Sequence, residues 1–87
     1  MDADDVDETL RAVLVDVLGI AADRVAGFGE STPLFGALPE FDSMAVAGLL
    51  TELEERLGIT IDDDEVDVDM LESFGSLLTF ARAKALR

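Results

Sequence analysis

Apolar residues recur every three or four positions in three separate segments of this chain, and that spacing favours a bundle of helices. It predicts a helix over Asp7–Leu18, a second over Ser43–Leu57 and a last one over Phe74–Leu86. A short helical turn is expected near Asp67–Glu72, while the apolar run Ile59–Ile61 is too short to predict a strand. We therefore expect an all-α fold of three main helices and one short helix.

The residues at the ends of these segments are ones that commonly cap helices. Gly19 and Gly58 follow the first and second helices, where a glycine is a common stop signal. Asp42 and Ser73 precede the second and last helices, where a side-chain oxygen can accept from a backbone N–H. The side chains expected to face the core are Val6, Leu10, Val13, Leu14, Val17 and Leu18, then Val46, Leu49, Leu50, Leu53 and Leu57, then Phe74, Leu77, Leu78 and Ala81.

The segment Ile20–Asp42, between the first and second helices, predicts a long loop. It is rich in glycine and proline, which interrupt regular structure. A structureless loop of this length is uncommon in so small a domain and is often functional. Its apolar side chains are expected to attach it to the core, namely those of Phe28, Leu34, Phe35 and Leu38.

The chain length of 87 residues allows one domain, so residues 1–87 are expected to form a single unit. A hydrophobic content of 49% is too high for a disordered acidic tail. No apolar run approaches the roughly 18 residues that a membrane span requires. The acidic start, Met1–Asp5, differs from the basic start of a secretory signal. A cytoplasmic protein without membrane insertion is therefore expected.

The chain has no cysteine and no histidine. This excludes disulfides, a Ser-His-Asp triad and the commonest metal ligand. Lys84 could activate a serine in principle, but its place near the C-terminus favours a surface lysine. The acidic run Asp62–Glu65 does not fit a calcium loop, because counting from Asp62 puts Asp67 at the sixth position and Ser73 at the twelfth. We expect no metal site and no stand-alone enzyme.

The formal net charge of −14 limits the kinds of partner. Such a chain repels nucleic acid and anionic membrane surfaces. It is steered instead toward partners with basic surfaces, at rates that fall with salt. The alternative interpretation is that the acidic residues only aid solubility.

The most informative motif is Asp42-Ser43-Met44, which stands at the head of the second predicted helix directly after the long loop. Leu53-Glu54-Glu55 lies near the end of the same helix. In these motifs, and in the order of elements along nearly the whole chain, the sequence resembles the acyl carrier protein family. That family has Asp-Ser-Leu at the start of its second helix and Leu-Glu-Glu near its end. The resemblance implies an acyl-carrier-protein-like bundle that forms a single carrier domain.

The resemblance also implies a function. A phosphopantetheinyl transferase would join 4'-phosphopantetheine from coenzyme A to Ser43 through a phosphodiester, with Asp42 and Met44 completing the attachment motif. The arm would carry acyl or aminoacyl intermediates as thioesters and present them to partner enzymes, and the chain would be a monomer. A phosphate suits this place, since the N-terminus of a helix presents N–H groups and a positive dipole end. Without the resemblance, Ser43 reads as an ordinary capping or first-turn serine.

The second helix departs from the family at three positions, one of which is Met44 in place of the usual leucine. Many members carry acidic residues one turn into this helix, where Ala45 and Gly48 stand here. Gly48 allows close approach of a partner or is a tolerated small residue, and both interpretations stay open. Partner recognition is therefore expected on the face made by Met44, Ala47, Thr51, Glu52 and Glu55.

A narrower resemblance covers Leu38–Val46 and Gly58–Glu65, which are similar to carrier proteins of exosortase-associated exopolysaccharide loci in bacteria. Fatty-acid synthesis and polyketide or peptide assembly are the alternative pathways. The rival to a carrier is an acidic helical interaction module that binds a basic partner without a prosthetic group.

Overall fold

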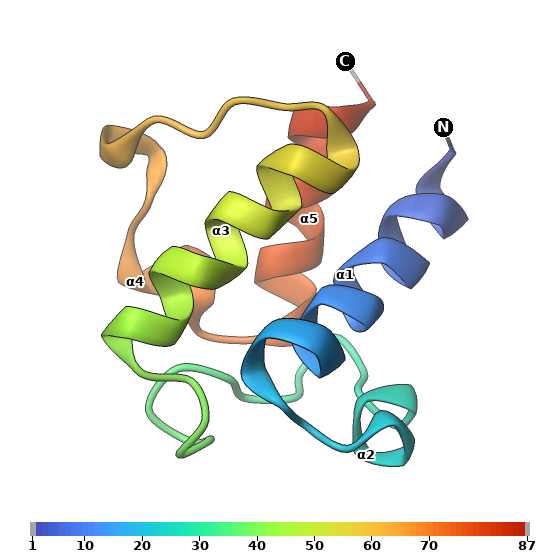
Figure 1. The fold of residues 1–87 in the computed structure, drawn as a ribbon, viewed down its shortest axis with the longest axis vertical. Coiled ribbons are helices and arrows are strands. Elements are labelled where there is room, and N and C mark those ends of the chain that lie inside the picture. The colour runs from blue at the N-terminus through green and yellow to red at the C-terminus, as the bar shows by residue number, and fades with distance from the viewer. Residues whose placement is uncertain (1, 87) are drawn as a thin grey trace.

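Three long helices make up most of the structure, a computed structural model that describes residues 2–86 (Figure 1). They are α1 (Ala3–Leu18), α3 (Ser43–Leu57) and α5 (Phe74–Ala85). Two short helices, α2 (Ala22–Ala26) and α4 (Val68–Leu71), and a 3-10 turn at Asp63–Glu65 lie in the connections. Helix α1 packs against both α3 and α5. No strand occurs within the described residues, so the all-α prediction is confirmed.

The core lies where the apolar spacing predicted it. All four inward-facing residues expected in α5 are buried, as are Val6, Leu10, Val13 and Leu14 of α1. In α3 the prediction was wrong for Leu50, which is only partly buried because it lies on the flank of the stripe formed by Val46, Leu49, Leu53 and Leu57. Val17 and Leu18 near the end of α1 are likewise partly buried. The connections supply the remaining core side chains, including Ile20, Val25, Leu34, Phe41, Met70 and Leu71.

The predicted caps form, and one further cap moves the start of the first helix. Gly19 and Gly58 end α1 and α3 in the left-handed conformation, with φ of 70° and 65°. Helix α1 begins at Ala3 rather than at Asp7, because Asp2 and Asp5 form a capping box. The Asp5 N–H donates to Asp2 Oδ1 at 3.0 Å, and the Asp2 N–H donates to Asp5 Oδ2 at 3.3 Å.

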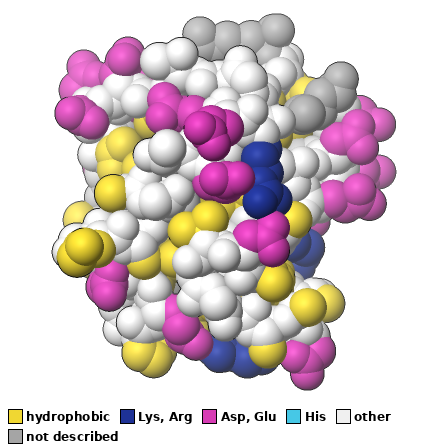
Figure 2. Space-filling view, viewed as in Figure 1, with side chains coloured by type: hydrophobic (Ala, Val, Ile, Leu, Met, Phe, Trp, Pro, Cys, Tyr) yellow, Lys and Arg dark blue, Asp and Glu magenta, His cyan; other side chains and the backbone are white. Residues whose placement is uncertain are grey.

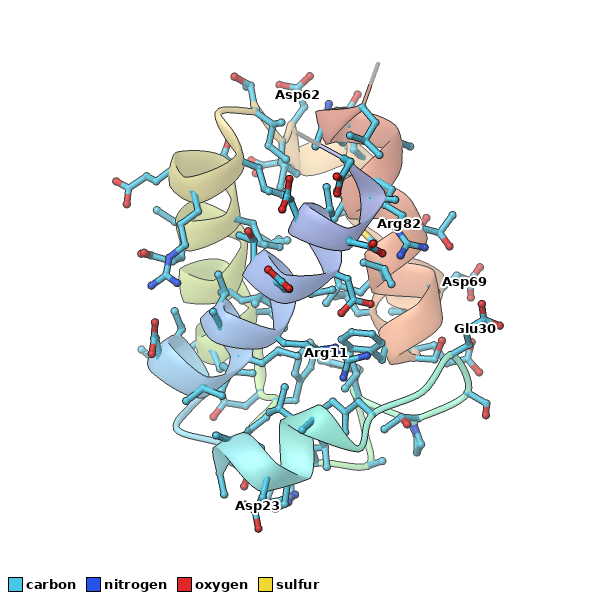
Figure 3. All side chains as sticks on the ribbon, turned by 90° about the vertical axis from the view of Figure 1, so that its right-hand side faces the viewer. Arg11, Asp23, Glu30, Asp62, Asp69 and Arg82 are labelled. Atoms are coloured by element: carbon cyan, nitrogen blue, oxygen red, sulfur yellow. The ribbon has the colours of Figure 1, made fainter. Side chains whose placement is uncertain are left out.

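The segment between α1 and α3 is not structureless, which corrects the prediction of an irregular loop. It forms α2, and Arg11 of α1 holds the end of that helix (Figure 3). The two terminal nitrogens of Arg11 donate to Val25 O at 2.6 Å and to Phe28 O at 3.0 Å. Its guanidinium also lies 4.4 Å from the centre of the Phe74 ring and pairs with Asp7.

The later part of this connection pairs with the chain around the start of α5. The N–H groups of Leu34 and Phe35 donate to Glu72 O and Leu71 O at 2.9 and 3.1 Å. In return, the N–H groups of Phe74 and Gly75 donate to Thr32 O and Glu30 O, both at 2.9 Å. Backbone hydrogen bonds therefore fix residues 30–35 to the bundle. No sequence motif predicts these bonds.

Contacts between distant parts of the chain bear on two further expectations. Lys84 is not a surface lysine: only 12% of its side chain is exposed, and its Nζ pairs with Glu65 at 2.9 Å. Gly48 is exposed, which leaves both of its interpretations open, and a Cβ added there would lie 3.3 Å from Val17 Cγ1 of α1. The small residue thus lets α1 and α3 approach each other. Arg87, which directly follows the predicted last helix, lies outside the described residues.

Gly75 provides a test of how firmly the connection is held. A Cβ added at Gly75 would lie 2.5 Å from Glu30 O and 2.9 Å from Glu30 Cα, which are backbone atoms that cannot rotate away. We expect Gly75→Ala to lower the free energy of unfolding by about 1–3 kcal/mol, as overpacking typically does. Urea unfolding followed by circular dichroism measures the change.

Gly29→Ala is the matched control, because a Cβ added at Gly29 meets no atom within 4 Å. The control should unfold at nearly the parent urea concentration. Equal stability of Gly75→Ala and the parent would contradict a fixed contact between residue 30 and α5.

Candidate functional site

Ser43 is the first residue of α3, and its side chain is exposed. Asp42 fills the capping role: its Oδ1 accepts from the Ala45 N–H at 2.8 Å, and its carbonyl accepts from the Val46 N–H at 2.9 Å. The Ser43 hydroxyl is therefore not needed as a cap, and it makes no hydrogen bond within residues 2–86. This arrangement removes the main reason for reading Ser43 as a structural cap.

The electrostatics at Ser43 suit an anion. Helix α3 has 15 residues, and no acidic residue stands in its first turn. The N–H groups of a first helical turn lack partners inside the helix, and the helix dipole places partial positive charge there. Asp42 already accepts from the Ala45 N–H, so a phosphate carried on the Ser43 oxygen would meet the helix dipole and the remaining N–H groups of this turn.

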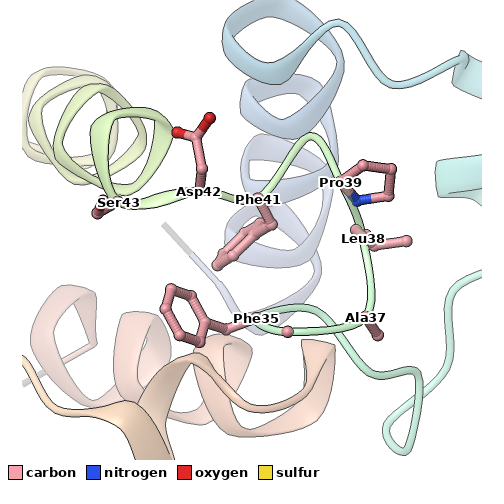
Figure 4. Close-up of a pocket in the computed structure, with 8 residues that line it drawn as sticks. Phe35, Ala37, Leu38, Pro39, Phe41, Asp42 and Ser43 are labelled. Carbon is pink, nitrogen blue, oxygen red and sulfur yellow. The ribbon is translucent and has the colours of Figure 1, made fainter.

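A hollow lies beside Ser43 on the side of the α2–α3 connection (Figure 4). We call it the loop hollow; it is lined by Phe35, Gly36, Ala37, Leu38, Pro39, Phe41, Asp42 and Ser43. The rings of Phe35 and Phe41 meet edge to face, 6.3 Å apart at 82°. Phe35 was expected to attach the connection to the core, and it does so only in part: Leu34 is fully buried, whereas its neighbour Phe35 is 39% exposed and contacts the core through Phe41.

An ion pair holds the segment just before Ser43. Arg24 of α2 donates to Glu40 Oε2 at 2.9 Å. Hydrogen bonding to backbone groups and then to Arg24 lowers the pKa of Glu40 below its ordinary 4.5. Since the folded pKa is the lower one, the stabilisation is present above pH 4.5 and is lost as the pH falls through the folded value.

Most of the residues expected to form the docking face are exposed on α3. Met44 is 86% exposed, and Ala47, Thr51 and Glu55 are exposed on the same side of the helix. The Thr51 hydroxyl donates to Ala47 O at 3.0 Å and so is turned back onto the helix. In Figure 2 hydrophobic side chains gather at the left edge, over the starts of α3 and α4.

Glu52 differs from the other residues of this face because it is already paired. Arg56 bridges Glu52 and Asp16 of α1, each at 2.8 Å. Hydrogen bonds to Asp16 and then to Glu52 raise the pKa of Arg56. Glu55 is therefore the more available of the two acidic side chains for a basic partner.

Sequence reasoning missed Val68 at this end of the molecule. It is 64% exposed on α4, whereas Met70 and Leu71 of the same short helix are buried. The available signal was the position of Val68 directly after the capping residue Asp67, whose carboxylate accepts from the Met70 N–H at 2.8 Å. A helix of four residues is too short for apolar spacing to show which side chain faces out.

Two other properties bear on the kind of site. Among the residues that the structure describes, no three acidic side chains are placed together so that they could hold a metal ion. Within the same residues, every helix is too short or too polar to span a bilayer.

Comparison with known proteins agrees with this geometry. A family model described as a phosphopantetheine attachment site matches residues 8–81. Acyl carrier proteins from two strains of Nitratidesulfovibrio vulgaris are each 32% identical over 60 residues, which cover 69% of this chain and 74% of theirs. The solution NMR structure of a holo acyl carrier protein from Nitrosomonas europaea matches with a TM-score of 0.78 and 37% identity, covering 90% of this chain and 92% of that one.

The chain therefore belongs to the phosphopantetheine-attachment family of carrier proteins. Like the relatives above, it is an acyl carrier protein, and its prosthetic group is a covalently attached phosphopantetheine. Proteins of this family act with phosphopantetheinyl transferases and acyl-handling enzymes. The exposed hydroxyl at the start of α3 fits such a group, because it combines an accessible nucleophile with N–H groups suited to a phosphate.

Proposed function

We propose that Ser43 is the residue that carries the phosphopantetheine arm. The observation that carries this proposal is the division of roles at the start of α3: Asp42 caps the helix, while the Ser43 hydroxyl is exposed and uncommitted. The arm supplies a terminal thiol, which holds an acyl or aminoacyl group as a thioester. Residues 1–87 then act as a single monomeric carrier domain in the cytoplasm that presents this cargo and does not itself catalyse a reaction.

The attachment reaction assigns a limited task to this chain. The Ser43 oxygen forms a bond to the phosphorus next to the pantetheine of coenzyme A, and the pyrophosphate bond breaks. The adenosine bisphosphate leaves, and the transferase takes the hydroxyl proton. The first turn of α3 then faces the new phosphodiester with its N–H groups. The chain therefore provides a nucleophile and the N–H groups that stabilise the phosphodiester charge, and the transferase provides the catalysis.

A Ser43→Ala variant tests this assignment. After incubation with coenzyme A and a broad-range transferase, the parent should gain the mass of one phosphopantetheine, and Ser43→Ala should gain none. Helicity should be unchanged, because Asp42 and not Ser43 caps α3.

Ser31→Ala is the matched control, since Ser31 is also exposed and lies in the same connection. It should be modified like the parent. An arm found on Ser43→Ala would contradict the assignment, and an unmodified parent would favour the acidic interaction module that has no prosthetic group.

We further propose that partner enzymes dock on the α3 face formed by Met44, Ala47, Thr51 and Glu55. An enzyme that receives the arm must lie beside Ser43, and Met44 is the most exposed large apolar side chain there. Glu55 offers charge to a basic surface, and Glu52 contributes less because Arg56 holds it. Charge of this kind mainly sets the encounter rate, while apolar contact sets the lifetime of the complex.

Met44→Glu tests this docking face. It places a charge in a contact expected to be apolar, and should slow modification by the transferase about tenfold, equivalent to about 1.4 kcal/mol. Initial rates from intact mass at subsaturating transferase provide the measurement.

Leu86→Glu is the control, because Leu86 is also an exposed apolar residue but follows the far end of α5. Glu55→Lys should slow modification at low salt more than Glu52→Lys does. Parent rates for both Met44→Glu and Glu55→Lys would place the docking face elsewhere.

A further inference from the structure

The loop hollow beside Ser43 has an apolar, partly aromatic lining. Attachment of an arm to Ser43 does not by itself require such a lining. Ser43 forms part of its wall, and the remaining wall is mostly apolar, with two aromatic rings. The only charged residue in the lining, Asp42, directs its carboxylate away from the rings (Figure 4) and toward the Ala45 N–H. The hollow thus offers an apolar surface directly at the attachment point.

Phe35 leaves part of its ring open at this surface. It is 39% exposed, although the neighbouring Leu34 is fully buried. A single exposed apolar side chain is ordinary, but here the ring adjoins other apolar side chains of the lining, and an exposed apolar patch is the informative observation. Its contact with Phe41, which is itself 3% exposed, keeps the Phe35 ring at the edge of the hollow.

The hollow is also preformed. Gly36, with φ of 88°, makes the turn that separates Phe35 from the rest of the wall. Leu34 O accepts from the N–H groups of Ala37 and Leu38 at 3.1 and 3.0 Å, and Leu38 O accepts from the Phe41 N–H at 3.0 Å. A rigid wall lowers the entropic cost of binding, because little has to be ordered when a ligand enters.

We infer that the phosphopantetheine arm rests in the loop hollow, with its dimethyl-bearing segment against Phe35 and Leu38. This inference rests on the proposed attachment at Ser43. The segment next to the phosphate carries two methyl groups and is the most apolar part of the arm. A short tether gives an effective concentration on the order of millimolar, so an apolar contact whose intrinsic Kd is at or below that concentration is populated at least half of the time. The thiol end lies farther along the arm, and a partner enzyme must draw the arm out of the hollow.

NMR spectra of the protein before and after attachment test this placement. In the holo protein, backbone amide shifts should change at residues 35–38 and 41 as well as next to Ser43. Nuclear Overhauser effects should join the methyl groups of the arm to the Phe35 ring. Intact mass is recorded on the same sample, so the presence of the arm is established independently.

Two variants and one control sharpen the result. Ala37→Glu adds a charge to the wall at an exposed position, and Phe35→Ser removes the ring. Each should remove more than half of the attachment-induced shift change at residues 35–38 while thermal melting shows a folded protein. Val68→Ser removes an exposed apolar side chain outside the hollow and should keep the shift changes.

Three outcomes would overturn the inference. Shift changes confined to the start of α3 in a fully modified protein would show an arm that does not use the hollow. If the shift changes persisted in Ala37→Glu, that would also show an arm that does not use the hollow. The hollow would then be a contact for a partner's side chain instead. A parent protein that gains no mass would overturn the proposed attachment itself and the placement with it.

Discussion

One arginine of the first helix joins the parts of the chain on which the site depends. Arg11 binds two backbone carbonyls at the end of α2, lies over the Phe74 ring at the start of α5 and pairs with Asp7 of its own helix. Phe28 completes this cluster, with its ring edge to face on Phe74 at 6.0 Å. Because most of the guanidinium donors are satisfied by fixed groups, a single side chain holds α1, α5 and the connection between α1 and α3 in one arrangement.

The position of Ser43 follows from that arrangement as much as from its own helix. The connection leaves the Arg11 cluster, pairs with the backbone around the start of α5 and forms the loop hollow before it reaches Asp42. Asp42 then caps α3, so the Ser43 hydroxyl is not used as a cap and remains exposed. The Ser43 hydroxyl thus lies between the α2–α3 connection on one side and a helix N-terminus on the other.

The elements that could be predicted from the sequence are those determined by residues close together in the chain. Apolar spacing located the long helices, and cap residues such as Asp42 and Gly58 marked their ends, since both signals lie within a few residues. The Asp42-Ser43-Met44 triplet pointed to the candidate residue. Features that depend on distant partners were missed: the α2 helix is too short for periodicity, Lys84 is covered by pairing with Glu65, and Gly48 is set by Val17 of another helix. The exposure of Phe35 was missed for a related reason, because an irregular segment has no period to assign its faces.

The claim that Arg11 fixes the loop is tested most directly by hydrogen exchange in an Arg11→Met variant, with Arg56→Met as a surface control. Methionine keeps an apolar stem over Phe74 but removes the donors to Val25 O and Phe28 O. The account predicts that the amides of Leu34, Phe35 and Gly75 exchange much faster in Arg11→Met than in the control, while amides in the middle of α3 keep most of their protection. Parent-like protection of those loop amides in Arg11→Met would contradict it.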